Sequence, residues 1–162
     1  HLSLKDAIET INKNKLLEVI RIGHKHMLKI GYKNPKIGIC GLNPHSGENG
    51  IFGDEEIKHF LPAINILKKE GINISNPISA DIIFRQAISG KYDLIIANYH
   101  DQGHIPVKLL YFDQSVNVTL GVPIIRTSVD HGTAFDLAFK NEVRYTNMVA
   151  SIIYAIRMCT KK

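Results

Sequence analysis

Residues 98–136 concentrate side chains that can do chemistry between short apolar runs. The polar members of this stretch that can bind a metal ion, move a proton or hold an anion are His100, Asp101, His104, Lys108, Asn117, Arg126, Asp130 and His131. Imidazoles and carboxylates bind divalent ions, whereas lysine and arginine bind phosphate or carboxylate groups. Strands formed by the apolar runs would hold these groups in fixed positions. The stretch therefore predicts an active site rather than a solvated surface.

Three apolar segments that are expected to form strands each run into a histidine: 36–41 into His45, 93–98 into His100 and 123–129 into His131. Helical patterns alternate with these segments, which predicts an α/β sheet, mostly parallel, with helices on both faces. Ligands of such sheets bind beyond the carboxyl ends of the strands. We therefore expect the three histidines to gather at one edge of one sheet.

Capping residues predict where several helices begin. Ser3 opens a sequence that resembles a capping box, and Asn14 can cap a second, longer helix. Asp54 begins a helix that Pro62 should kink or divide, because proline lacks the N–H that an inner helical turn needs. Thr133 is expected to cap a helix that follows His131.

His45, His100 and Asp101 are candidate metal ligands on residue type and predicted position alone. Two neutral imidazoles and a carboxylate suit zinc or a similar divalent ion, and Asp101 could instead orient an imidazole. His131 would be the third histidine of such a set. A polar loop hydrogen-bonded to itself would give the same pattern, and the sequence has no H-E-x-x-H motif.

Lys108, Asn117 and Arg126 suit a substrate that carries phosphate and carboxylate groups. A lysine and an arginine in surface salt bridges would be the simpler reading of the same residues. Arg126 is the more suggestive of the two, since a charge among the apolar residues around it should need a buried anionic partner.

The composition is that of an ordinary globular domain, with 162 residues of which 44% are hydrophobic and 22% are charged. The formal net charge is +5, but the lysines are scattered among acids, so we expect no nucleic-acid partner. Cys40 and Cys159 are the two cysteines, which suits a reduced compartment. Since we find neither a signal peptide nor a long apolar span, we expect a cytoplasmic protein without a membrane partner.

Three motifs together resemble one enzyme family: GLNPHSGENG at 41–50, YHDQGHIPVK at 99–108 and VNVTLGVPIIRTSVDHGTA at 116–134. They are similar to 4-hydroxythreonine-4-phosphate dehydrogenase, the NAD-dependent enzyme of pyridoxal phosphate (vitamin B6) synthesis. The resemblance implies a fold like that of isocitrate and isopropylmalate dehydrogenases. It runs along residues 1–162 and matches the C-terminal portion of the family, so we expect the N-terminal half to be absent.

The resemblance implies a different metal site from the one that the residues suggest alone. It places the ion, zinc, magnesium or cobalt, on His1, His45 and His100, without His131. Asp81 and Asp101 match family acids that lie near the metal and support it.

The resemblance also assigns the substrate and cofactor residues. Lys108, Asn117 and Arg126 match residues that contact the phosphorylated substrate, and Lys108 and Asp101 are the catalytic candidates. His131, Gly132 and Thr133 match the turn that meets the adenosine part of NAD or NADP in the wider isocitrate and isopropylmalate dehydrogenase family.

The implied reaction is the oxidation and decarboxylation of 4-phosphooxy-threonine to 3-amino-2-oxopropyl phosphate, in a homodimer whose subunits share the active site. One alternative is a sister dehydrogenase for another phosphorylated hydroxy acid, such as threonate or erythronate phosphate. Another is a module that binds a metal or an anion without catalysis, which the 162 residues alone would be.

Overall fold

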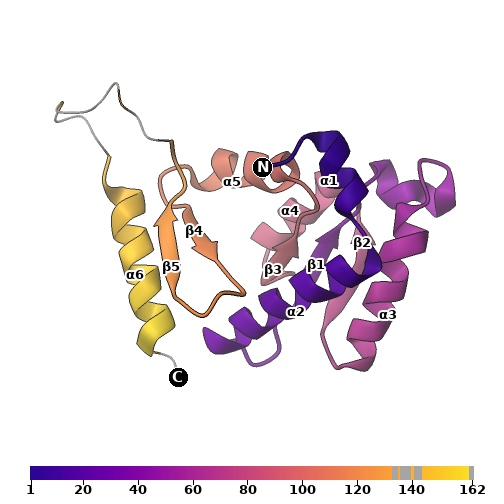
Figure 1. Ribbon diagram of the computed structural model, residues 1–162, viewed down its shortest axis with the longest axis horizontal. Helices are drawn as coiled ribbons and strands as arrows, with labels where there is room; N and C mark the ends of the chain where they lie inside the picture. The colour runs from indigo at the N-terminus through magenta and orange to yellow at the C-terminus, as the bar shows by residue number, and fades with distance from the viewer. Residues whose placement is uncertain (133–134, 136–139, 141–143, 161–162) are drawn as a thin grey trace. The chain divides into compact units, whose positions relative to one another are not determined.

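The computed structural model describes residues 1–132, 135, 140 and 144–160 (Figure 1). It divides into two compact units, His1–Pro106 and Val107–Lys162, which are described in turn. None of the helices in the described ranges is both long and apolar enough to cross a membrane.

The first unit is built on a three-stranded parallel sheet in the order β2-β1-β3. Its strands are β1 Ile37–Cys40, β2 Ile74–Ile78 and β3 Leu94–Ile96. In the central strand all four residues are buried, as expected for a parallel strand that is covered on both faces. Ile37 pairs with Leu94, and Ile39 pairs with Ile96, so β1 and β3 run side by side in register.

Helices cover both faces of this sheet. They are α2 Lys13–Lys29, α3 Leu61–Lys69 and α4 Ala80–Ile88, which contact its strands. The same unit also contains α1 Leu4–Thr10 and the start of α5 His100–Tyr111, which continues into the second unit. On the α4 face, a Cβ added to Gly38 would lie 3.0 Å from Cδ1 of Ile83. The predicted α/β class and mostly parallel sheet are therefore confirmed.

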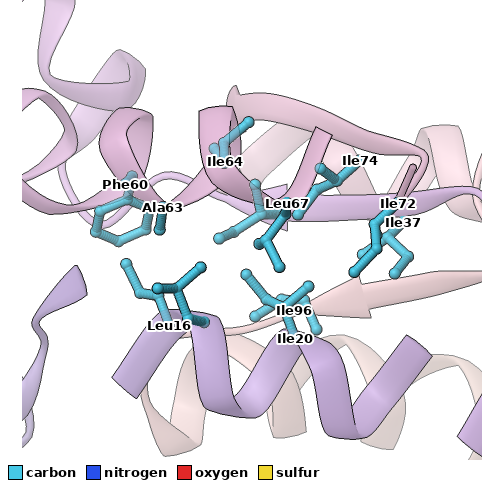
Figure 2. Packing of buried hydrophobic residues seen from close by; sticks show 12 residues of the cluster. Leu16, Ile20, Ile37, Phe60, Ala63, Ile64, Leu67, Ile72, Ile74 and Ile96 are labelled. Atoms are coloured by element: carbon cyan, nitrogen blue, oxygen red, sulfur yellow. The ribbon is translucent and has the colours of Figure 1, made fainter. Parts of the chain in front are cut away.

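The main core lies between the sheet and helices α2 and α3 (Figure 2). Its members include Leu16 and Ile20 from α2, Ala63, Ile64 and Leu67 from α3, and Ile37, Ile74 and Ile96 from the strands. Burial of each leucine or isoleucine side chain among them contributes about 1.5–3 kcal/mol.

Two of the predicted helix starts can be compared directly with the structure. The Ser3 side chain accepts a hydrogen bond from the Asp6 N–H at 3.2 Å, which confirms the first cap. The second cap is Asn12 rather than Asn14: Asn12 is extended, and its Oδ1 accepts from the Lys15 N–H at 3.0 Å. The prediction for Asn14 was wrong because two asparagines stand close together, and only backbone conformation selects between them.

Pro62 divides its helix as predicted. A π-helical turn, η2 Glu56–Phe60, leads directly into α3, and Pro62 occupies the first turn of α3. Proline fits the start of a helix because the N–H groups there have no partner within the helix.

The second unit contains a separate two-stranded antiparallel sheet, β4 Val116–Thr119 and β5 Arg126–Val129, with helix α6 Thr146–Thr160 packed against it. The expectation that His131 leaves the same sheet as His45 and His100 is therefore wrong. Residues 120–125 are too few for a parallel crossover, which takes about a dozen residues, so the two strands pair as a hairpin. The helix predicted to start at Thr133 lies outside the described residues.

Candidate functional site

The carboxyl ends of β1 and β3 are joined by two side chains. The Asn98 Nδ2 group donates to the Cys40 carbonyl at 2.8 Å. In the first turns of α5, Gln102 donates from Nε2 to the Gly41 carbonyl at 2.8 Å, and its Oε1 accepts from the Asn98 N–H at 2.8 Å. The loop that carries His45 and the helix that carries His100 thus leave adjacent strands from a fixed junction. For these two histidines the predicted common edge is confirmed.

Three imidazole rings lie close together at the start of α5. The ring of His1 lies 4.9 Å from that of His100, and His104 stacks on His100 at 4.2 Å with an interplanar angle of 12°. The Nδ1 of His100 lies 2.7 Å from Oδ1 of Asp101 and donates to it when protonated. A carboxylate at Nδ1 orients an imidazole and leaves its Nε2 to bind a metal ion.

His45 lies in a loop, η1 Pro44–Gly50, whose backbone is left-handed over five consecutive residues. The φ angles are 51° at His45, 54° at Ser46, 82° at Gly47, 40° at Glu48 and 57° at Asn49. A left-handed conformation costs a non-glycine residue roughly 1–2 kcal/mol, and such strain concentrates at functional sites. The imidazole of His45 lies 6.0 Å from the ring of Phe52, between centroids.

Glu56 is a buried carboxylate that holds this loop, and nothing in the sequence pattern singled it out. Only 3% of the surface of Glu56 is exposed. Oε1 accepts from the N–H groups of Leu42 and Asn43 at 2.8 and 2.9 Å, and Oε2 accepts from Asn43 Nδ2 at 2.9 Å. In sequence it is one of two adjacent glutamates, and only the helical phase distinguishes the buried Glu56 from Glu55. Gln102 is also buried, with 7% of its surface exposed, and was missed because its partner, the Gly41 carbonyl, lies far along the chain.

The histidines and acids at this edge fit a divalent ion by donor chemistry, with His100 oriented by Asp101 and with His1 beside it. Within residues 1–132, 135, 140 and 144–160, however, no three His, Cys, Asp or Glu side chains are arranged to hold a metal together. His1, His45 and His100 as a ligand set therefore stay a prediction. Asp81 lies exposed in the first turn of α4.

Two buried polar atoms near the same strand ends are also available to a bound group. Neither Oγ of Ser46 nor Oδ1 of Asn98 has a hydrogen-bond partner in the described part of the chain. Buried polar atoms are nearly always paired, so these two support a bound ion, water or ligand at this edge.

Asn117 and Arg126, two of the predicted substrate residues, share one face of the β4-β5 hairpin. Thr119 pairs with Arg126 and Asn117 pairs with Ser128, so these four side chains point the same way. The opposite face carries Thr127, whose hydroxyl donates to the Ser151 carbonyl of α6 at 3.0 Å. The hairpin therefore has one face that is covered by α6 and one polar face.

Arg126 differs from the sequence expectation. It is exposed, and its guanidinium donates from NH1 to the Thr119 hydroxyl at 2.8 Å. The expectation that it needs a buried anionic partner was wrong, because the end of a short hairpin leaves the guanidinium hydrated.

Lys108, the third predicted substrate residue, is held by Asp130 directly after β5. Its ammonium lies 2.9 Å from Oδ2 of Asp130 and also donates to the Asp130 carbonyl. Nζ lies 5.5 Å from the centroid of the Phe112 ring. These contacts fix the direction of the ammonium group.

The predicted cofactor turn is only partly described. His131 is exposed, and its Nδ1 lies 2.8 Å from the Gly132 carbonyl. A Cβ on Gly132 would meet nothing within 4 Å among the described residues. Thr133 lies outside the described residues, and the assignment of this turn to NAD or NADP stays a prediction.

A family model described as "Pyridoxal phosphate biosynthetic protein PdxA" matches residues 1–155. The chain belongs to this family. The resemblance that the sequence motifs suggested is therefore confirmed. The assignments of individual site residues remain predictions.

Known relatives of the chain have two different names. It is 48% identical over 163 positions to a protein of Oceanobacillus iheyensis named putative D-threonate 4-phosphate dehydrogenase, covering 100% of this chain and 49% of that protein. It is also 48% identical over 162 residues to a protein of Geobacter metallireducens named 4-hydroxythreonine-4-phosphate dehydrogenase, covering 100% of this chain and 48% of that protein.

A solved structure supports the same fold. The crystal structure of 4-hydroxythreonine-4-phosphate dehydrogenase from Klebsiella pneumoniae matches with a TM-score of 0.89 and 42% identity, over 100% of this chain and 49% of that one. The chain thus spans about half the length of the relatives that it matches.

Proposed function

We propose that the full-length protein is an NAD- or NADP-dependent dehydrogenase that oxidises and decarboxylates 4-phosphooxy-threonine to 3-amino-2-oxopropyl phosphate, a step in pyridoxal 5′-phosphate synthesis. Membership of the family supports the reaction class. The observation that carries the proposal is the group of His1, His100 and Asp101 at the end of β3, beside the strand end that leads to His45.

His1, His45 and His100 would hold one divalent ion, zinc, magnesium or cobalt, with Asp101 orienting His100 and Asp81 as a supporting acid. When bound, the ion would supply Lewis acidity at the substrate hydroxyl, and the nicotinamide would supply the hydride acceptor. His131, Gly132 and Thr133 would contact the adenosine part of the cofactor.

Arg126 and Asn117 would anchor the anionic groups of the substrate from the polar face of the hairpin, where a fork of N–H donors suits a phosphate or carboxylate. Oxidation of the substrate hydroxyl would give a β-keto acid. Loss of carbon dioxide from this acid would leave an enolate, which must gain a proton. Lys108 would donate that proton or stabilise the charge, because Asp130 already orients its ammonium.

Alanine substitution of the histidines tests the metal site. His45→Ala and His100→Ala in the full-length protein should each lose bound metal and at least about 100-fold in kcat, since each removes a ligand of the Lewis acid. His24→Ala, on α2, is the matched control and should keep both. Metal content and turnover that match those of the unchanged protein in both His45→Ala and His100→Ala would contradict the proposal.

D-threonate 4-phosphate is the second candidate substrate, because the Oceanobacillus relative with that name is as similar as the Geobacter one. The two substrates differ at C2, which bears an amine in one and a hydroxyl in the other. Measuring NADH formation by the full-length protein with each compound, and with erythronate phosphate, decides between them. Turnover of the threonate compound alone would exclude the primary assignment, and no turnover of any would favour a binding module without catalysis.

We also propose a cytoplasmic homodimer whose subunits share the active site, without a nucleic-acid partner. Apolar side chains on α6 support an interface, since Met148, Ile152, Ile153 and Ile156 are each at least half exposed. Light scattering of the full-length protein should give the mass of two chains, and the mass of one chain would contradict the dimer.

A further inference from the structure

The backbone that leaves β1 is held by side chains from η2, from α5 and from the connection between β3 and α5. Asn98 and Gln102 bind the carbonyls of Cys40 and Gly41, and Glu56 binds the N–H groups of Leu42 and Asn43. The Gly41 N–H donates to the Ile78 carbonyl of β2 at 2.7 Å. Every step of the chain from the end of β1 to Asn43 is thus fixed before the left-handed loop begins.

Burial of Glu56 is difficult to explain by stability alone. Removing a carboxylate from water is costly, and the three N–H bonds that it accepts from Leu42 and Asn43 offset that cost. An apolar side chain at the same place would avoid the cost. A buried polar network whose members are hydrogen-bonded in this way favours one particular backbone arrangement.

The Glu56 carboxylate also lies close to the middle of the loop, at Gly47. A Cβ on Gly47 would lie 2.9 Å from Oε2 of Glu56. The carboxylate of Glu56 therefore fixes the position of the loop at two points, at its start at Asn43 and near its middle at Gly47. His45 lies between these two points.

We propose that Glu56 and Gln102 are positioning residues that place His45 relative to His100 for the divalent ion. The inference rests on the proposed function, because it assumes that these histidines bind a metal. Glu56 acts on the His45 loop, and Gln102 joins that loop to the first turn of α5. Neither side chain need touch the ion, and residues that orient metal ligands change affinity by about 10–100-fold.

Glu56→Gln in the full-length protein is the main test. In the unchanged protein, Asn43 Nδ2 donates to Glu56 at 2.9 Å and to Glu55 at 2.7 Å. The Gln amide keeps the size of the side chain but places an NH2 group opposite Asn43 Nδ2, so that two donors face each other. Zn²⁺ affinity, measured by competition with a chromophoric chelator, should fall about 10-fold or more. Glu18→Gln, an exposed change on α2, is the matched control and should leave the affinity unchanged.

The double substitution Glu55→Gln with Glu56→Gln separates positioning from simple loss of stability. If Asn43 flips, its Oδ1 can accept from both new amide groups, and the contacts are restored in reverse. Zn²⁺ affinity should return to within about threefold of the unchanged protein, because the outer-shell partner is again in place. A double variant that binds Zn²⁺ as weakly as Glu56→Gln would overturn the proposal.

His45→Ala in the same titration keeps the two ideas apart. If it loses Zn²⁺ while a folded Glu56→Gln retains full affinity, the positioning role is wrong and the metal site stands. If His45→Ala retains Zn²⁺, the metal site itself is wrong. Should Glu56→Gln fail to fold by circular dichroism, Gln102→Ala decides: weaker Zn²⁺ binding supports the proposal, and unchanged binding overturns it.

Discussion

At the scale of single residues, two glycines with a left-handed backbone, one in the loop after β1 and one after α4, differ in their surroundings. Gly47 has φ +82°, and an added Cβ would lie 2.8 Å from the Gly53 carbonyl and 2.9 Å from Oε2 of Glu56. Gly90 has the same φ of +82° but has nothing within 4 Å of the added Cβ. Alanine at Gly90 would therefore add backbone strain alone, whereas alanine at Gly47 would add backbone strain and a steric conflict.

Gly47→Ala should therefore destabilise the protein more than Gly90→Ala. Both pay the left-handed strain of about 1–2 kcal/mol, and only Gly47→Ala adds overpacking of about 1–3 kcal/mol. Urea unfolding of both variants measures the two free energies. Equal losses would mean that the loop can move away from Glu56, which would also weaken the case for a fixed His45.

His100 and Asp101 could be predicted from the sequence as chemical groups because they directly follow a recognisable buried strand. Glu56 and Gln102 could not, since their importance lies in hydrogen bonds to backbone far along the chain, such as that from Gln102 to Gly41. His1 required the family resemblance, because no local pattern marks it. Spacing identifies candidate ligands, but it does not identify the side chains that orient them.

At the scale of elements, the buried strand β1 determines the chemistry of its last residue. Burial raises the pKa of the Cys40 thiol to about 12, from an ordinary value of 9.0. Because the folded pKa is above the unfolded one, the thiol favours the folded state fully below pH 9. That contribution is lost as the pH rises from the unfolded value toward the folded value.

Cys40→Ala provides the measurement. The difference in unfolding free energy between the unchanged protein and Cys40→Ala should be constant from about pH 7 to 8.5 and then narrow by up to about 1.4 kcal/mol per pH unit. At about pH 8, a thiol reagent should label exposed Cys159 in the native protein, and Cys40 only after unfolding. Rapid labelling of Cys40 in the native protein would show that β1 opens readily.

The elements themselves differed in how far they could be predicted. The strands at 36–41 and 93–98 were placed correctly because continuous apolar runs of that length indicate a strand covered on both faces. The segment at 123–129, which contains β5, was expected to join the main sheet. Segment periodicity does not report which partner a strand takes, and here the short connection at 120–125 decided it.

At the scale of the whole molecule, the proposed chemistry is divided between two compact units of the chain. The predicted metal residues lie in His1–Pro106, and the predicted substrate and cofactor residues lie in Val107–Lys162. The chain also spans only 48–49% of the relatives with dehydrogenase names. Catalysis by groups that must be held within fractions of an ångström needs all the elements that fix them.

The 162 residues alone should therefore form no NADH from either phosphorylated substrate, while the full-length protein should form it with both cofactor and divalent ion present. The physical reason is that the chain spans about half the length of its relatives, so elements that orient the substrate and exclude water in a complete active site are lacking. The Geobacter relative serves as the positive control in the same assay. Zn²⁺ binding by the 162 residues should be titrated in parallel. Metal binding without turnover would show that the metal ligands lie in these residues and that other groups needed for turnover lie outside them. Full turnover by the 162 residues alone would contradict the prediction and show that these two units contain a complete active site.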